Sequence, residues 1–571
     1  MENSPLLEVK NLNIRFPSEG GDFHAVKDFS FMLNKGETLG IVGESGSGKS
    51  VTCLSLLRLL PGECRIDGSS KFYFEEKEVD LVTAKENELR KIRGKHISMI
   101  FQEPMTSLNP TLKCGYQASE ILIEHEKISS KDAKKKIISL LEEVALLNPE
   151  RIFNSYPHEL SGGQRQRVMI AMALSCKPEL LIADEPTTAL DVTVQKNILA
   201  TMKRLKETHN LSMIFITHDL GVVSEVADNV AVLYKGELVE FGTTQQILNN
   251  PVHPYTKGLI ACRPNMKHRL VKLPTVSDFL QNSEAHNLFM QTEESADVRK
   301  ARHTKMYSCE SVLQVTSLKT YFPVKKGFFS KRPEPVRAVD DVSFDVYPGE
   351  TLGLVGESGC GKSTLGRTLL RLVDSTSGNI LYKGKELTQM KYSEMKHLRR
   401  HLQIIFQDPY SSLNPKLTVG YAITEPMKVQ RMEQNDKERR KVAAALMECV
   451  GLSEEDLKKY PHEFSGGQRQ RVCIARALAL KPEFIICDES VSALDVSVQA
   501  QVLNLLNELK NDFGFTYIFI SHDLSVVKFM SDRIIVMKSG KIEEEGEADS
   551  MYKNPKSDYT KKLIAAIPGM K

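Results

Sequence analysis

The chain has 571 residues, a length that corresponds to about three to four domains. Hydrophobic residues make up 41% and charged residues 26%, the balance of a globular protein, and no stretch reaches the roughly 18 consecutive apolar residues of a membrane-spanning helix. The net charge of +3 lacks the strongly basic footprint that nucleic-acid-binding proteins usually carry, so we expect no nucleic-acid partner.

The start of the chain and its cysteines indicate the cellular setting. Residues 1–9 lack the basic region and apolar core of a secretory signal, so we expect a cytoplasmic chain that acts at a membrane only as a peripheral subunit. The 10 cysteines form no C-x-x-C pair and no Cys/His cluster at zinc spacing. We expect them to be small buried residues that stay reduced.

One unit is written twice along the chain. The segment GETLGIVGESGSGKS at residues 36–50 returns as GETLGLVGESGCGKS at residues 349–363, and four further blocks recur in the same order. We therefore predict two homologous domains, residues 1–263 and 311–571, joined by a linker with some helix at residues 264–310. Residues 71–91 make the first copy longer, and their charge suggests a variable surface loop. We also expect a solvated loop at the basic run Lys325, Lys326, Lys331 and Arg332.

Each copy contains the pattern G-x-x-x-x-G-K-S between an apolar run, TLGIV or TLGLV, and an apolar helical stretch. This strand–loop–helix context is typical of a phosphate-binding loop, because glycines let backbone N–H groups curl around phosphate oxygens at a helix N-terminus. We expect the lysines to reach the outer phosphates and the final serines to bind Mg²⁺. The predicted loops comprise Gly43, Glu44, Ser45, Gly46, Ser47, Gly48, Lys49 and Ser50, and Gly356, Glu357, Ser358, Gly359, Cys360, Gly361, Lys362 and Ser363.

A glutamine ends the next apolar strand of each copy. Residues 97–101 precede Gln102, and residues 402–406 precede Gln407. A glutamine in this position can sense both Mg²⁺ and the attacking water, so we predict a metal-binding and catalytic role. The regions that follow, residues 103–156 and 408–460, are predicted to form helical subdomains. In the first of them, apolar residues recur at helical spacing (Ile137, Leu140, Leu141 and Val144).

The tetrapeptide SGGQ follows Tyr-Pro-His-Glu and one apolar residue in both copies and opens a helix-forming stretch. A small residue before two glycines at a helix start forms a second anion site. A plain glycine turn is the alternative, but it does not explain the recurrence. One nucleotide does not need two phosphate cradles from one domain, so we predict that each SGGQ serves the nucleotide of the other copy (Ser161, Gly162, Gly163 and Gln164; Ser465, Gly466, Gly467 and Gln468).

Two further apolar runs in each copy end in charged or titratable residues. Residues 180–183 and 484–487 are typical of buried central strands and are followed by Asp-Glu. We expect Asp184 and Asp488 to hold Mg²⁺ through its water shell, and Glu185 and Glu489 to orient and polarise the attacking water. His218 and His522 also end apolar strands. A lone histidine there is usually structural, but its recurrence after the carboxylates favours contact with the γ-phosphate.

Taken together, these blocks resemble the ATP-binding cassette (ABC) superfamily over both halves of the chain. The resemblance implies an α/β fold of two tandem P-loop NTPase domains, each with a helical subdomain, that close head to tail around two ATP molecules. Residues 43–50 would then face residues 465–468, and residues 356–363 would face residues 161–164. Residues 189–191 and 493–495 match the turn that crosses this interface. Alignment with the family places Phe16 and Phe322 on adenine, with ordinary core packing as the open alternative.

A narrower resemblance concerns FQEPMTSLNP, FQDPYSSLNP and the tail NPVHPYTKGL, which look like the ATPases of bacterial dipeptide, oligopeptide, nickel and glutathione importers. The fused layout is most similar to the glutathione and related peptide importers. The resemblance implies ATP hydrolysis with Mg²⁺ at the cytoplasmic face of the bacterial inner membrane, coupled to two integral membrane permease subunits and a solute-binding protein. The second tail, NPKSDYTKKL, lacks the His-Pro, and only Cys262 and Cys309 follow the first tail, so we expect no iron–sulphur cluster.

Some departures and alternatives remain. Ser490 and Val491 replace Pro186 and Thr187 of the first copy, and Val51 stands where many family members have a second threonine. No catalytic group is lost, so we expect both sites to hydrolyse ATP. The alternatives are a soluble tandem-cassette ATPase acting on ribosomes or DNA, and an exporter ATPase. The strand-ending histidines and the lack of zinc modules or long heptads disfavour the first, and the importer-type tail disfavours the second by analogy.

Overall fold

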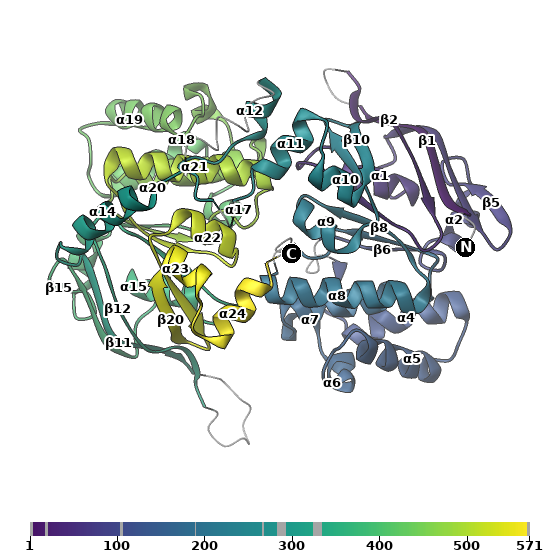
Figure 1. The fold of residues 1–571 in the computed structure, drawn as a ribbon, viewed down its shortest axis with the longest axis horizontal. Helices are drawn as coiled ribbons and strands as arrows, with labels where there is room; N and C mark the ends of the chain where they lie inside the picture. Colours follow the sequence, from purple (N-terminus) through teal and green to yellow (C-terminus); the bar gives the residue numbers. More distant parts are fainter. Residues whose placement is uncertain are drawn as a thin grey trace. The chain divides into compact units, whose positions relative to one another are not determined.

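The computed structural model describes residues 4–17, 21–102, 107–188, 190–264, 266, 268–281, 293–323 and 334–567. The chain forms two compact units (Figure 1). The first comprises Met1–Ile260 and Val276–Ser283 with Pro568–Lys571, and the second comprises Ala261–Thr275 with Glu284–Ile567. The predicted basic loop at Lys325, Lys326, Lys331 and Arg332 lies outside the described residues.

Short apolar strands build the central sheet of the first unit. The sheet has the order β10-β9-β3-β8-β7-β6, and its pairs are parallel except for β10 with β9. Three inner strands are buried along their whole length, because helices cover both faces of a parallel sheet. The strands are β3 (Thr38–Val42), β6 (Ile97–Ile100), β7 (Leu180–Asp184), β8 (Ser212–Thr217), β9 (Asn229–Tyr234) and β10 (Glu237–Thr243).

The second unit repeats this sheet as β16-β17-β18-β13-β19-β20, again parallel except for its last pair. Its strands are β13 (Thr351–Val355), β16 (Leu402–Ile405), β17 (Phe484–Asp488), β18 (Thr516–Ile520), β19 (Arg533–Lys538) and β20 (Lys541–Glu547). The carboxyl ends of parallel strands meet at one edge of a sheet, which is where ligands bind in open α/β folds. The predicted α/β fold with two P-loop domains is confirmed.

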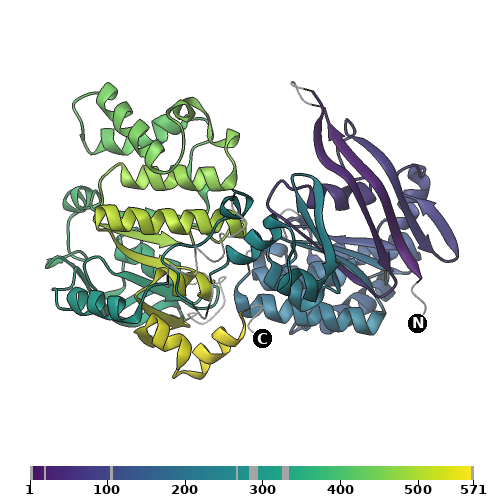
Figure 2. The same cartoon turned by 45° about the horizontal axis from the view of Figure 1, so that its top comes forward.

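A smaller antiparallel sheet accompanies each central sheet. In the first unit it has the order β2-β1-β4-β5, and Figure 2 shows its long twisted strands in purple. It consists of β1 (Pro5–Phe16), β2 (Phe23–Asn34), β4 (Arg65–Phe74) and β5 (Lys77–Asp80). The counterpart in the second unit consists of β11 (Leu313–Phe322), β12 (Val336–Val346), β14 (Ser377–Tyr382) and β15 (Lys385–Glu386), in the order β12-β11-β14-β15.

The prediction of a surface loop at residues 71–91 is wrong. This segment contains the end of β4, all of β5 and most of the helix α2 (Glu86–Ile92). Lys71, Glu78 and Asp80 share one face of this hairpin, and Phe72, Phe74 and Val79 lie on the other, because side chains alternate along a strand. Phe72 is fully buried in the core, and Val79, which pairs with it, is nearly so. The added length extends the β4–β5 hairpin, which is longer than the two-pair β14–β15 hairpin.

The predicted helical subdomains are present in both units. In the first, Ile137, Leu140 and Leu141 lie on α5, and Val144 caps its C-terminal end. The helices are α4 (Cys114–Glu126), α5 (Ser130–Glu143), α6 (Pro149–Asn154), η1 (Pro157–Glu159) and α7 (Gly162–Ala173). Their counterparts are α17 (Pro409–Ser412), α18 (Val419–Val429), α19 (Asp436–Cys449), η2 (Glu454–Lys458), η3 (Pro461–Glu463) and α20 (Gly466–Leu478).

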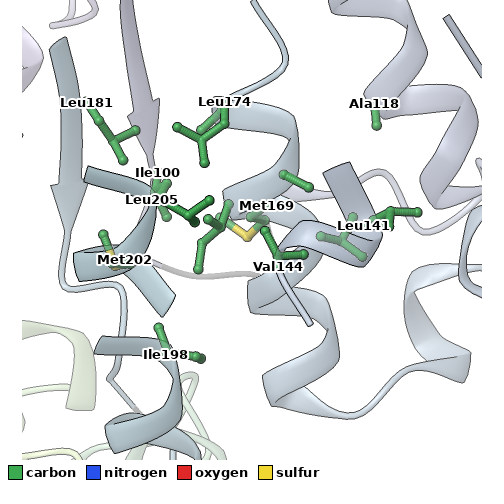
Figure 3. Close-up of a cluster of buried hydrophobic side chains, with 14 of the residues drawn as sticks. Ile100, Ala118, Leu141, Val144, Met169, Leu174, Leu181, Ile198, Met202 and Leu205 are labelled. Carbon is green, nitrogen blue, oxygen red and sulfur yellow. The ribbon is translucent and has the colours of Figure 1, made fainter. Parts of the chain in front are cut away.

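One apolar cluster joins this helical part of the first unit to its central sheet. Figure 3 shows Leu141 and Ala118 of the helical part packed towards Met169 and Leu174 at α7, with Leu181 of β7 in the same cluster. All of these side chains are nearly or fully buried, so the helix that SGGQ opens is fixed against the strand that precedes Asp-Glu.

The remaining helices lie outside the helical subdomains. In the first unit they are α1 (Lys49–Leu56), α8 (Val192–His209), α9 (Leu220–Val226), α10 (Thr244–Asn249), α11 (Pro254–Ala261) and α12 (Val276–Gln281). In the second they are α14 (Ala296–Tyr307), α15 (Lys362–Leu369), α16 (Tyr392–Leu398), α21 (Val496–Phe513), α22 (Leu524–Met530), α23 (Ala548–Lys553) and α24 (Asp558–Ala565). In the described part of the chain, no helix has both the length and the apolar character needed to cross a membrane.

Part of the predicted linker at residues 264–310 folds onto the second unit. The side chain of Asn504 in α21 makes two buried hydrogen bonds, each 2.8 Å long, to the backbone N–H and C=O of Leu273. Arg302 and His303 of α14 contact the buried carboxylate of Asp532 at 2.6 and 3.2 Å. Burial alone would raise the pKa of Asp532, but Lys510 and these two side chains outweigh it and hold that pKa well below its usual range. Residues 268–275 and 293–310 of the predicted linker therefore belong to the second unit, whereas α12 belongs to the first.

Candidate functional site

The phosphate-binding loops lie at the carboxyl ends of the central strands β3 and β13, as the sequence predicts. The last glycine of each loop, Gly48 or Gly361, caps the next helix with φ of 100° or 110°. This left-handed conformation strains any residue with a Cβ atom. A Cβ on Gly48 would also lie 2.5 Å from the carbonyl oxygen of Ala25. The loops therefore need glycine here for both conformation and space.

The loop lysines fold back over their own loops. Lys49 Nζ donates to the carbonyl oxygens of Gly43 and Glu44 at 2.8 and 2.7 Å. Lys362 Nζ donates to those of Gly356 and Glu357 at 2.7 and 2.9 Å. Both lysine residues are about 5% exposed or less. Each ammonium group is thus held at the mouth of a loop of backbone N–H groups, which is the arrangement that binds phosphate.

The last serine of each loop meets the acid that ends a neighbouring strand. Ser50 Oγ donates to Asp184 Oδ1 at 3.0 Å, and Ser363 Oγ donates to Asp488 Oδ1 at 2.7 Å. The second carboxylate oxygen of Asp488 is buried and has no hydrogen-bond partner among the described residues. Hydroxyl and carboxylate oxygens are among the donors that Mg²⁺ prefers, and it usually completes its shell with water and phosphate oxygens. The residues present fit this ion.

Burial raises the pKa of both aspartates, and it raises the pKa of Asp184 to about 6. The hydrogen bond from Ser50 lowers the pKa of Asp184, but burial outweighs it. A carboxyl group with a folded-state pKa above its unfolded value destabilises the fold once pH exceeds the unfolded pKa, and the cost is complete above the folded pKa.

We therefore expect Asp184→Asn to stabilise the first unit without metal or nucleotide. The gain should be at most about 3 kcal/mol at pH 8, fall to roughly half at pH 5 and vanish below about pH 4, where both states are protonated. Urea denaturation in EDTA at the first two pH values, followed by circular dichroism, measures it. The exposed Asp67→Asn is the control, and equal stability of Asp184→Asn and the unaltered chain at pH 8 would contradict the buried charge.

The glutamate after β7 is the centre of a hydrogen-bonded group. Gln102 Nε2 and Thr188 Oγ1 donate to Glu185 Oε2 at 3.1 and 2.8 Å, and His218 Nδ1 lies 3.3 Å from Oε1. Burial alone would raise the pKa of Glu185, but His218 and then Thr188 outweigh it and lower that pKa to about 2. Burial likewise opposes the charged form of His218, yet Glu185 raises the pKa of the imidazole. Each group therefore favours the charged form of the other, and the carboxylate is a weak base.

The second unit has a similar group, which differs from the first in its detailed contacts. Gln407 Nε2 donates to Glu489 Oε2 at 2.8 Å, and His522 Nδ1 lies 3.3 Å from the same oxygen. Ser492, the counterpart of Thr188, donates instead to the backbone oxygen of Glu489. In addition, Arg367 lies 3.9 Å from Asp488, where the first unit has Leu54. The two sites therefore share their main groups but not the surroundings of their carboxylates.

Both glutamates adopt a backbone conformation that is unusual for their residue type. Glu185 has φ of 45° and Glu489 has φ of 49°. A non-glycine residue in this left-handed region costs on the order of 1 kcal/mol, and such strain concentrates at functional positions. The conformation recurs at both strand ends, as do several other left-handed positions of the two copies, such as Lys177 and Lys481.

The SGGQ segments cap α7 and α20. The hydroxyls of Ser161 and Ser465 accept from the N–H groups of Gln164 and Gln468 at 3.3 Å. In return, the side-chain oxygens of these glutamines accept from the serine N–H groups at 3.0 and 2.9 Å. The second glycine of each segment is required by packing, since a Cβ on Gly163 would lie 2.7 Å from Val194.

The first glycine of each segment has no such requirement. The nearest atoms to a Cβ on Gly162 and Gly466 are 3.5 and 3.9 Å away, which are ordinary contacts, and neither residue has positive φ. Packing within the cassette therefore does not explain these glycines.

The adenine-stacking candidates end the strands β1 and β11. Phe16 is partly buried against the core of the first unit, and Phe322 is 40% exposed. Core packing therefore accounts for Phe16 in part but not for Phe322. The turn at residues 189–191 includes Ala189, which lies outside the described residues, whereas Asp191 and Asp495 cap α8 and α21.

Some contacts at the site were not foreseen from the sequence. These are the Thr188 bond to Glu185 and a hydroxyl from each C-terminal tail to the phosphate-binding loop. The recurrence of Tyr-Thr in both tails was a signal for the second contact.

Comparisons with known proteins agree with these features. The family model described as ABC transporter matches residues 26–188 and 339–492, and the model described as Oligopeptide/dipeptide transporter, C-terminal region, matches residues 239–287 and 544–571.

Similar relatives are named Glutathione import ATP-binding protein GsiA. The one from Pectobacterium atrosepticum is 46% identical over 99% of this chain and 89% of its own length. Those from Salmonella choleraesuis and Escherichia coli K12 are each 47% identical, over 100% and 99% of this chain and over 90% and 89% of their own length.

Proposed function

The chain belongs to the ABC transporter family, and from this premise we propose that its two cassettes close on two ATP molecules. One ATP would bind between residues 43–50 and residues 465–468, and the other between residues 356–363 and residues 161–164. Gly162 and Gly466 support this pairing, because nothing in their own cassettes requires a glycine there. A phosphate approaching the helix N-terminus closely would require one.

The chain is the ATP-hydrolysing subunit of a peptide-type ABC importer. The observation that carries this conclusion is the similarity to glutathione import ATP-binding proteins along essentially the whole chain, including both oligopeptide-type tails. By this similarity the solute is glutathione or a related short peptide. Phe16 and Phe322 would stack on the two adenine rings.

Hydrolysis would depend on the groups at the strand ends. Glu185 and Glu489 would orient and polarise the attacking water, with Gln102 and Gln407 beside it. In the free chain His218 keeps the pKa of Glu185 low. When ATP binds, transfer of His218 to the γ-phosphate would remove this hydrogen bond, stabilise the transition-state charge and restore the basicity of the carboxylate. His522 would act in the same way on Glu489.

Mg²⁺ would be held by Ser50 and Gln102 with Asp184 in the first cassette, and by Ser363 and Gln407 with Asp488 in the second. When bound, the ion neutralises charge on the phosphate oxygens and orients them for in-line attack. Burial raises the pKa of Asp184 only to about 6, so its carboxyl is mainly ionised at neutral pH, and cation binding favours that form further.

Membrane coupling would take place through the helical subdomains. Two integral membrane permease subunits would dock there from the bilayer, and a solute-binding protein would deliver the solute on the other side. ATP binding favours the closed pair of cassettes, and hydrolysis removes the γ-phosphate contacts that hold it, so the order of states is set by differential binding. The chain would thus work as a peripheral subunit at the cytoplasmic face of the bacterial inner membrane.

Co-purification tests this function directly. We expect the tagged chain to elute with detergent-solubilised permease subunits encoded beside it, and expect its ATPase rate in proteoliposomes to rise several-fold with solute-loaded binding protein. Unloaded binding protein is the control. Elution with ribosomes instead of membrane subunits, or a rate that ignores the loaded binding protein, would contradict the importer function.

A further inference from the structure

The C-terminal tail of each cassette reaches the phosphate-binding loop through one tyrosine. In the first cassette the backbone N–H of Glu44 donates to the hydroxyl of Tyr255 at 2.9 Å, and Tyr255 has no exposed surface. In the second cassette the N–H of Glu357 donates to the hydroxyl of Tyr559 at 3.2 Å. Glu44 and Tyr255 are 211 residues apart in the chain, so the tertiary fold creates this contact.

The tyrosine holds the same peptide group that the loop lysine uses. The carbonyl of Gly43 and the N–H of Glu44 belong to one planar peptide unit. Lys49 Nζ donates to the carbonyl oxygen at one end of this unit at 2.8 Å, and the Tyr255 hydroxyl accepts from the N–H at the other end. Rotation of the unit would break both bonds. The tyrosine therefore fixes the direction of the carbonyl that anchors the lysine.

The second cassette repeats this arrangement in detail. Lys362 Nζ donates to the carbonyl oxygen of Gly356 at 2.7 Å, and Tyr559 holds the N–H of the same peptide unit. Two cassettes of different sequence thus make the same pair of bonds on one peptide plane.

Each tyrosine is itself held by the edge strand of the central sheet. In the first cassette the carboxylate of Glu240 in β10 accepts from the N–H groups of Val252 and His253 at 2.8 and 3.0 Å. The His253 ring then accepts the Tyr255 N–H at 3.2 Å, and the ring of Tyr234 lies 4.3 Å from that of Tyr255.

The second tail reaches the same result with different residues. Glu544 in β20 accepts from the N–H groups of Lys556 and Ser557 at 2.9 and 3.0 Å. Ser557 Oγ replaces the histidine and accepts the Tyr559 N–H at 3.1 Å, and Lys538 lies 4.9 Å from the tyrosine ring centre. The missing His-Pro of this tail therefore leaves the position of the tyrosine unchanged.

We propose that Tyr255 and Tyr559 are positioning residues for ATP, which set the peptide group that aims each loop lysine at the outer phosphates. The proposal rests on the proposed function, because ATP is the ligand. It gives the oligopeptide-type tail a role at the nucleotide site. These tyrosines do not touch the phosphates; they act through Lys49 and Lys362.

The test replaces both tyrosines by phenylalanine in the full chain, in a background carrying Glu185→Gln and Glu489→Gln so that binding is measured without hydrolysis. We expect the Kd for MgATP to rise by about three- to tenfold, the size expected from loss of one hydrogen bond per site. AMP has no outer phosphates, so its Kd should change by less than about twofold.

Hydrogen exchange provides a readout that a general loss of stability would not move selectively. The amides of Glu44 and Glu357 should exchange faster in the variant, while the rest of each central sheet is unchanged. Tyr73→Phe and Tyr517→Phe are the controls, because each tyrosine lies on a strand and neither bonds a phosphate-binding loop in the described contacts. Both controls should leave the MgATP affinity within about twofold of the background.

Three results would overturn the proposal: an unchanged Kd for MgATP, an equal rise for AMP, or an equal rise in the controls. If the double replacement does not fold, the single replacements Tyr255→Phe and Tyr559→Phe are tested instead. Each leaves the other cassette intact and should raise the Kd for MgATP at one of the two sites. An unchanged Kd at both sites would count against the proposal. Failure of the proposed function has a different signature, because the unaltered chain would then not bind MgATP at all. That result would overturn both.

Discussion

Replacing Glu185 and Glu489 together by glutamine should abolish ATP turnover and leave ATP bound. Glutamine has the same shape and still accepts the hydrogen bonds that Thr188 and the neighbouring glutamine donate. It cannot polarise the attacking water, and the loss of a general base lowers a rate by about a hundredfold or more. It also removes negative charge beside the γ-phosphate. We therefore expect two ATP molecules per chain to survive gel filtration, measured by nucleotide extraction.

The control for this experiment is built into the repeat. Glu179 and Glu483 precede the same two strands at their opposite ends, where each pairs with a histidine at about 3 Å. Replacing both by glutamine removes equivalent charges from the chain, and the ATPase rate should stay within about twofold. Undiminished turnover after replacement of Glu185 and Glu489 would remove both from the assigned role.

Replacing a lysine of one phosphate-binding loop together with the serine of one SGGQ segment should show which cassette completes which site. In the glutamine background, Lys49→Ala with Ser465→Arg places both lesions in one proposed site, so one ATP per chain should remain. Lys49→Ala with Ser161→Arg places one lesion in each site, so none should remain. The arginine is expected to block the phosphate by its bulk. Both serines are exposed, so the change costs only a helix cap, about 1 kcal/mol.

The single variants are the controls, and each should retain one ATP per chain. The opposite pattern has a clear meaning. If the pair Lys49→Ala and Ser161→Arg keeps one ATP, and the pair Lys49→Ala and Ser465→Arg keeps none, each cassette wraps its own nucleotide and the composite sites do not exist. Equal occupancy in both double variants would equally contradict the pairing.

The sequence predicts the central sheets and most of the site because the information there is local. Buried parallel strands are continuous apolar runs, and each is followed within a residue or two by the side chain that it presents at the sheet edge, as β7 is by Glu185. The glycines of the phosphate-binding loop are needed for local conformation. The ends of elements are predicted less accurately. The apolar run that predicts the helix after the first loop covers residues 51–60, but α1 ends at Leu56.

Features that depend on distant partners could not be predicted. Charge in residues 71–91 suggested a loop because the exposed hairpin turn and the strand beside it carry four consecutive charged residues, 75–78, and only the core reveals the buried side of Phe72. The bond from Glu44 to Tyr255 joins residues at opposite ends of a cassette. The pKa of about 2 for Glu185 likewise depends on His218, which a different strand supplies.

The attachment of residues 261–275 and of α14 to the second unit matters to anyone who divides this chain for separate expression. A fragment that starts at residue 311, where the repeat begins, would lack the backbone partner of Asn504 and the side chains of Arg302 and His303 that contact Asp532. Its interior would then carry an amide and a carboxylate with fewer partners. A fragment that starts at Ala261 keeps them, so the natural cut point is at the end of α11.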